Sequence, residues 1–162
     1  DRLVEAVFAL RMSVINPRRQ AMLEQVIARG EVGNVRALVE VMVWPMAEEL
    51  RPRAEGNHYV QFLARSSIER KLAIELAPPD LMSAWHSTIA YLRAAISYLP
   101  DDIADARIIL ASEQTISALA SYEVRQLGGT AAFPGLVETL IDMIAAGVSA
   151  PVSPQALSAF AG

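Results

Sequence analysis

Residues 80–100 read DLMSAWHSTIAYLRAAISYLP, and this stretch decides the fold class. Its large apolar side chains recur every three or four residues, which is the spacing of one face of an α-helix. Asp80 is suited to cap the start of such a helix, and Pro100 is suited to end it. The stretch predicts a long amphipathic helix, and the stripe on its buried face is Leu81, Trp85, Ile89, Leu92, Ile96 and Leu99.

The same helical spacing continues outward in both directions, and Gly, Pro, Asn and Asp fall between the periodic segments. No stretch alternates with a period of two, so the sequence predicts an all-α fold. We expect a single-domain antiparallel bundle of about seven helices over residues 1–162. Besides the central stretch, the expected helices cover residues 1–14, 17–30 after the cap Asn16, 34–46 with the cap Asn34, 57–76 from Asn57, 101–126 and 134–149.

Composition excludes several classes of protein. The 162 residues carry a net charge of −4, 53% are apolar, and cysteine is absent. The chain is therefore too apolar for a disordered protein, and it has no disulfide framework or thiolate metal site. An acidic domain with scattered bases is a poor binder of nucleic acid.

The termini suggest a cytoplasmic location. The charge-free run 143–162 has the length of a membrane span, but Pro151 and Pro154 interrupt it, so we expect a helix end and a tail. The chain begins at Asp1 with no initiator Met and no signal pattern, so we expect that residues preceded it.

The residues do not form a recognisable catalytic motif. Gly128-Gly129 lacks the Lys and Ser/Thr of a phosphate loop, and His58 and His86 have no metal-ligand partner at helical spacing. We read the acidic residues Glu48, Glu49 and Glu123 as solvated helix surface. The sequence predicts a protein that is not an enzyme and has no metal site and no organic cofactor.

Aromatic and methionine residues mark a candidate ligand pocket. Pro45 lies inside an apolar helix between Trp44 and Met46, where it removes a backbone hydrogen bond and kinks or ends the helix. Methionine and tryptophan provide adaptable apolar walls, and His86 can orient a ligand by a hydrogen bond. The alternative is that these residues belong to an ordinary core. The predicted pocket residues are Met42, Trp44, Met46, Tyr59, Phe62, Met82, His86 and Ile89.

The last two predicted helices suggest a homodimer through residues 101–127 and 134–149. The later one has two apolar stripes, so it needs a second partner inside the domain or from another subunit. The earlier one has a charge-free run, 114–122, rich in small residues that allow a helix to approach closely. The alternative is that both are central core helices. The predicted interface residues are Leu110, Gln114, Ser117, Ser121, Val137, Leu140, Ile141, Ile144 and Val148.

The order and the amino-acid sequences of several segments resemble those of the C-terminal regulatory domain of TetR-family transcriptional repressors. The segments are residues 11–26 (RMSVINPRRQAMLEQV), 59–65 (YVQFLAR), 84–102 (AWHSTIAYLRAAISYLPDD) and 133–154 (FPGLVETLIDMIAAGVSAPVSP). The resemblance implies an all-helical domain with a small-molecule pocket that dimerises through its last two long helices. It also implies that a ligand shifts the spacing of two DNA-reading domains and releases the operator.

The helix-turn-helix domain that the resemblance implies is absent from these 162 residues, and residues 1–14 look like the helix that would connect to it. We therefore expect an effector-sensing and dimerisation domain that binds a mainly apolar small molecule and meets operator DNA only through the absent domain. Arg18 and Arg19 alone are too few bases for operator binding. The alternative is a dimeric helical adaptor that has no small-molecule site.

Overall fold

A computed structural model of the chain describes residues 2–52, 58–65 and 79–160. The described residues are all-α, with seven α-helices, two short 3-10 helices and no strand. This confirms the predicted fold class. The elements in chain order are α1 (Arg2–Ala28), α2 (Val35–Ala47), η1 (Glu48–Leu50), α3 (Tyr59–Arg65), α5 (Pro79–Ala95), α6 (Asp101–Val124), η2 (Leu127–Gly129), α7 (Phe133–Ser149) and α8 (Pro154–Phe160).

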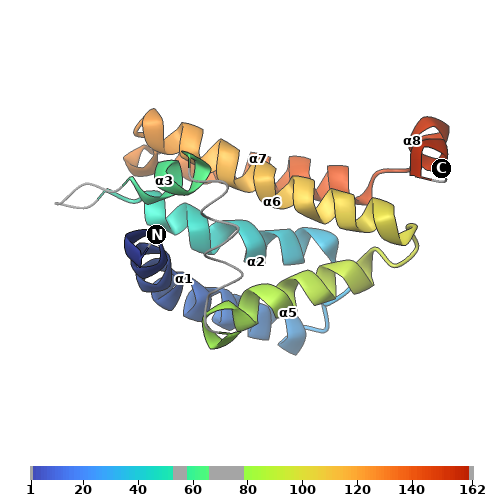
Figure 1. Cartoon of the computed structure of the whole chain (residues 1–162), viewed down its shortest axis with the longest axis horizontal. Helices are drawn as coiled ribbons and strands as arrows, with labels where there is room; N and C mark the ends of the chain where they lie inside the picture. Colours follow the sequence, from blue (N-terminus) through green and yellow to red (C-terminus); the bar gives the residue numbers. More distant parts are fainter. Residues whose placement is uncertain (1, 53–57, 66–78, 161–162) are drawn as a thin grey trace.

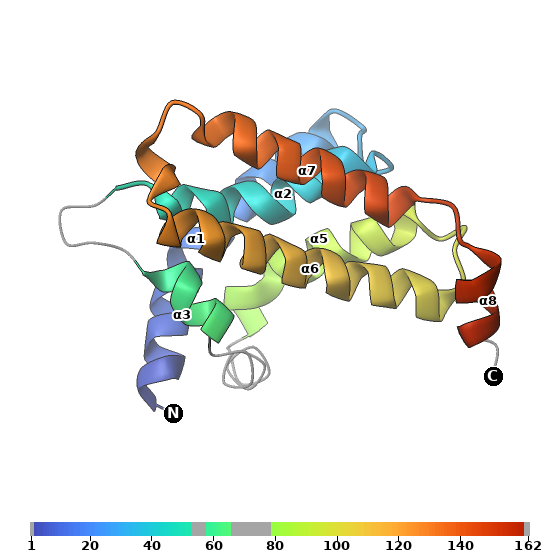
Figure 2. The same ribbon diagram turned by 90° about the horizontal axis from the view of Figure 1, so that it is seen from above.

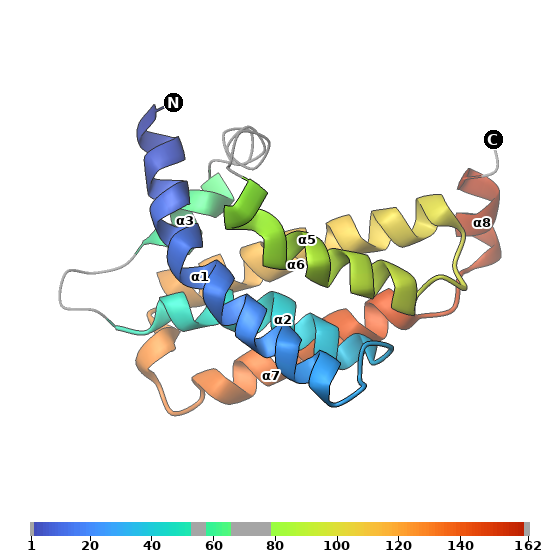
Figure 3. The ribbon, with the colours of Figure 1, turned by 90° about the horizontal axis from the view of Figure 1, so that it is seen from below.

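Helix α2 occupies the centre of the bundle. In Figure 1, α6 and α7 lie above it and α1 and α5 lie below it. Figure 2, seen from above, shows α6 and α7 side by side over α2, and Figure 3 shows α1 and α5 on the opposite face. The sequence of α2 fits this place, because most of its residues are apolar and buried on all sides.

The two helices expected over residues 1–14 and 17–30 are one continuous helix, α1, with Pro17 inside it. The prediction of a break with Asn16 as cap was wrong. Asn16 is instead a buried residue whose side-chain amide donates to the carbonyl of Asp80, 3.3 Å away. Packing of Phe8, Met12 and Ile15 on one side of Pro17 and Leu23 and Val26 on the other holds the helix across the proline.

Other predicted boundaries differ by smaller amounts. Asn34 caps α2 as expected, since its side chain accepts from the backbone N–H of Ala37. Helix α5 starts at Pro79, one residue before the predicted cap Asp80, and ends at Ala95 ahead of a turn. The predicted cap Asn57, and residues 66–76 of the expected fourth helix, lie outside the described residues.

The expected C-terminal tail is a second correction, because Pro154–Phe160 form the short helix α8. The chain bends by 66° between α7 and α8. No single helix of the described part of the chain is long and apolar enough to cross a membrane, and only this bent pair has sufficient length together.

Buried charged groups tie the central elements together. Arg19 on α1 is almost fully buried, and its guanidinium donates to the carbonyls of Val41 and Met42 on α2, at 3.4 and 3.5 Å. Burial lowers the pKa of Arg19 to about 10, and the neighbouring Tyr59 hydroxyl acts in the opposite direction. This arginine satisfies backbone groups inside the core that water cannot reach.

Two acidic residues that we read as solvated surface are buried, so those predictions were wrong. Glu49 has no exposed side-chain surface, and its carboxylate is bound by Arg11 at 3.3 Å and by Arg18 at 3.0 Å. Glu123 accepts from the backbone N–H groups of Val60 and Gln61 at the start of α3. The cost of burying each carboxylate is offset by its partners: Glu49 meets positive charge, and Glu123 meets backbone N–H donors, from a segment distant in sequence.

Candidate functional site

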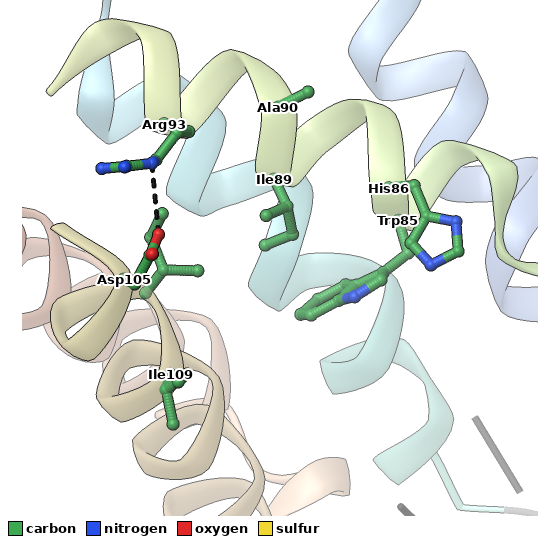
Figure 4. A pocket seen from close by; sticks show the side chains of 8 residues that line it. Trp85, His86, Ile89, Ala90, Arg93, Asp105 and Ile109 are labelled. Carbon is green, nitrogen blue, oxygen red and sulfur yellow. Dashed lines mark ion pairs between the residues drawn. The ribbon is translucent and has the colours of Figure 1, made fainter. Parts of the chain in front are cut away.

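A cleft of about 530 Å³ lies between α5 and α6. A volume of this size suits a small organic molecule. Figure 4 shows Trp85 and Ile89 extending from α5 and Arg93 reaching toward Asp105 on α6. The residues that line the cleft are Trp85, His86, Ile89, Ala90, Arg93, Asp105, Ile108 and Ile109.

The wall of the cleft is mainly apolar. On α6, Ile108 is buried and Ile109 is 57% exposed, so a large aliphatic side chain is open to the cleft. Facing it, Trp85 and Ile89 are half-buried and pack against the core. A bound molecule that covered these groups would remove apolar surface from water, which is the main source of affinity in such sites.

Trp85 connects the cleft to the buried charge of α1. The guanidinium carbon of Arg19 lies 5.1 Å from the centroid of the Trp85 ring, in cation–π geometry. The same ring lines the cleft. A ligand that contacts Trp85 therefore touches a side chain that already holds Arg19, and through it the backbone of α2.

Charged groups form one end of the cleft. Arg93 on α5 binds Asp105 at 3.1 Å and Asp101 at 2.9 Å, both on the first turns of α6. The Asp101 side chain is 93% exposed and that of Asp105 is 62% exposed. Exposed pairs of this kind contribute little to stability, so they are free to reorganise around a ligand.

The structure separates the eight predicted pocket residues. Only His86 and Ile89 line this cleft. Met42, Met46, Tyr59 and Met82 are buried in the core of the chain. Trp44 faces away toward α7, where its indole N–H donates to Glu138 at 2.9 Å, and Phe62 on α3 is half-buried against the core. For these six residues the interpretation as ordinary core or packing residues fits the geometry better.

Sequence reasoning missed six of the cleft residues: Trp85, Ala90, Arg93, Asp105, Ile108 and Ile109. The spacing of Trp85, Ile89 and Arg93 places them on one helix face, and this signal was available. We assigned Trp85 to the core instead. The partners from α6 follow no local pattern, because their place in the cleft depends on how α6 crosses α5.

The predicted interface residues also fall into two groups. Val137, Leu140, Ile141, Ile144 and Val148 are buried within one chain, in the core that α7 shares with α2. The assignment of this stripe to a partner subunit was wrong, since a side chain already covered by its own domain offers no surface. Leu110, Gln114, Ser117 and Ser121 lie exposed on α6, so their contact with a partner stays a prediction.

The described residues contain no group of three or more His, Asp or Glu side chains that could hold a metal ion. Comparison of the chain with models of protein families, with curated proteins and with solved structures found no match. The functional proposal therefore depends on the sequence and on the geometry of the chain itself.

Proposed function

We propose that the chain is the effector-sensing and dimerisation domain of a TetR-like cytoplasmic transcriptional regulator. Its ligand is a small, mainly apolar molecule that occupies the cleft between α5 and α6. The operator DNA is bound by a separate helix-turn-helix domain outside these 162 residues. The observation that carries this proposal is that α6 borders the cleft and also presents exposed uncharged residues outside it, such as Leu110, Gln114 and Ser117.

The exposed uncharged residues lie on the outer sides of α6 and α7. On α7, the second apolar stripe includes Met143, which is 59% exposed, and Gly147. On α6, Leu110 is 61% exposed. We define the α6–α7 face as Leu110, Gln114, Ser117, Ser121, Leu136, Met143 and Gly147, which carry no charge; the exposed Glu113 borders them on α6.

A second copy of the chain is the partner that this face suits. Exposed large apolar groups beside small residues allow two helix pairs to pack closely around a two-fold axis as a four-helix interface. The corrected interface uses the outer stripe of α7 because the inner stripe packs on α2.

The coupling between ligand and partner would pass through two contacts. Ile109 lines the cleft and its neighbour Leu110 belongs to the α6–α7 face. Trp85 lines the cleft and stacks on Arg19 of α1, the helix that would lead toward the DNA-binding domain. A ligand that displaces α5 from α6 would therefore change both the dimer contact of α6 and the packing of α1 against α5.

Sedimentation of the purified chain tests the dimer. We expect a dimer at micromolar concentration, and a monomer for the Met143→Glu and Leu110→Glu variants, because a charge in a closely packed interface is costly. The control is Ile27→Glu, which changes an exposed residue of α1 and should remain a dimer. A monomeric wild-type chain would overturn the dimer proposal.

Fluorescence of Trp85 tests the cleft. The Trp44→Phe variant leaves Trp85 as the sole tryptophan, and titration with the uncharged apolar dye N-phenyl-1-naphthylamine should change its emission. Ala90→Trp should fill the cleft and abolish dye binding, with the helical circular dichroism spectrum unchanged.

The same two measurements decide the alternative, a dimeric helical adaptor without a ligand. The observation in its favour is that Met42, Met46, Tyr59 and Met82 form packed core. A stable dimer that binds no dye in the cleft would favour the adaptor over the sensor.

A further inference from the structure

The charges around the α5–α6 cleft indicate which kind of apolar molecule it takes. We infer that the ligand is an organic cation, with an apolar body against Trp85 and Ile89 and a positive group at Asp105, the carboxylate that lines the cleft. This inference rests on the proposed function, because it names the ligand class of the same cleft.

The polar end of the cleft has an excess of negative charge. One guanidinium, that of Arg93, is bound by two carboxylates: that of Asp105, which lines the cleft, and that of Asp101, which lies one turn earlier on α6 and does not line it. Both carboxylates are largely exposed, so they can turn toward a second cation without losing burial energy. An anionic group at this end would meet two negative charges and would have to displace one of them from Arg93.

The opposite end of the cleft carries positive charge behind its wall. Arg19 is buried against Trp85, and the carbonyl groups that it binds hold it in place. A cationic group beside Trp85 would be repelled by this guanidinium. The two ends together orient the ligand, with its uncharged part at Trp85 and its cation at the start of α6.

The length of the cleft fits a short amphiphile. Trp85 and Arg93 are eight residues apart on one helix, which corresponds to about 12 Å along its axis. The apolar side chains Ile89 and Ala90 lie between them on α5 and line the cleft together with Ile109 on α6. An aryl group joined by a chain of a few carbons to an amine spans this distance.

Three compounds of matched shape test the inference: 4-phenylbutylamine, 4-phenylbutanol and 4-phenylbutyrate. Binding to the dimeric Trp44→Phe protein is followed by Trp85 emission at low ionic strength. We expect the amine to bind on the order of tenfold more tightly than the carboxylate, with the alcohol between them. The advantage of the amine should shrink in high salt, because exposed charges are screened.

Variants with opposite expected signs remove alternative explanations. Asp105→Asn should reduce the preference for the amine, and Arg93→Gln should increase it, because the two aspartates then lack their cation. Asp101→Asn removes the second carboxylate bound to Arg93, whose side chain is 93% exposed, and should also reduce the preference for the amine. Asp142→Asn is the matched control, since it removes the same charge from the exposed surface of α7 beside Arg36.

The outcomes separate this inference from the proposed function. If the carboxylate binds as well as the amine, or if Arg93→Gln abolishes binding, the cation inference is overturned and the sensor proposal stands. If none of the three compounds and no dye binds, both are overturned. A preference for the amine that Asp142→Asn removes as strongly as Asp105→Asn would place the effect outside the cleft and would also overturn the inference.

Discussion

Arg19 on α1 donates to the Val41 carbonyl on α2, which Pro45 leaves without a backbone donor. In a regular helix the carbonyl of Val41 would accept from the N–H of residue 45, and proline has none. The Nε of Arg19 lies 3.4 Å from this oxygen. A helix defect in the centre of the bundle is thus compensated by a side chain from another helix, and the same side chain supports Trp85 at the cleft.

Replacement of Arg19 by Met should destabilise the chain by about 2 kcal/mol, because it leaves buried carbonyl groups unsatisfied. In a Pro45→Ala background the cost should fall by about 1 kcal/mol, since the introduced alanine supplies the missing backbone N–H. Urea denaturation of the four proteins measures this coupling. Equal costs in both backgrounds would show that Arg19 and Pro45 are independent.

Neighbouring glutamates should differ sharply in their effect on stability. Glu49→Gln removes the charge between Arg11 and Arg18 in a fully buried position, and we expect a loss of about 3 kcal/mol. Glu48→Gln changes the adjacent, partly exposed residue, which is bound by Arg18 at 3.5 Å, and we expect a loss below about 1 kcal/mol. The denaturation midpoints of the two variants measure these losses in stability. Similar losses would contradict the difference in burial between Glu49 and Glu48.

Removal of the Glu123 side chain should loosen α3. Glu123→Ala deletes the acceptor for Val60 and Gln61, and helix caps of this kind contribute about 1 kcal/mol. Hydrogen exchange at these two amides should accelerate relative to the rest of the chain. Glu113→Ala, an exposed substitution on the same helix, is the control and should leave the exchange of α3 unchanged.

Stability should fall at alkaline pH because of Tyr59. Burial, and then the Glu49 carboxylate, raise the pKa of its hydroxyl above the ordinary value of 10.0. The contribution is complete below pH 10 and is lost above it, because the unfolded chain then releases a proton that the folded chain retains. Burial of Arg19 acts in the opposite direction over this range, so the comparison of wild type with Tyr59→Phe isolates the tyrosine. The slope of stability against pH above about 10 should be less negative in the variant, and identical slopes would contradict the prediction.

Gly128 should not tolerate a side chain. A Cβ at this position would overlap the backbone carbonyl of Leu50, where η2 crosses close to η1. Gly128→Ala should therefore lower the melting temperature by several degrees, on the order of the shift expected for 1–2 kcal/mol. Gly135→Ala, with open space around its Cβ and a place inside α7, should leave the melting temperature unchanged or raise it.

The all-α class, the cap at Asn34 and the span of α7 followed from local patterns, because apolar periodicity and capping chemistry act within a few residues. Leu92, Ile96 and Leu99 of the stripe on residues 81–99 were also read correctly as buried, although the helix ends at Ala95. These features need no knowledge of the neighbouring helices.

Other features depended on the tertiary structure, which overrode the local patterns. In the folded chain α1 continues past Pro17, Glu49 and Glu123 are buried, and the inner stripe of α7 packs on α2. The tertiary structure also assembled the cleft from α5 and α6, and joined Arg93 to Asp101 and Asp105. The physical reason is that burial and pairing depend on which distant segment packs opposite each residue, and helical periodicity identifies a buried face without naming its partner.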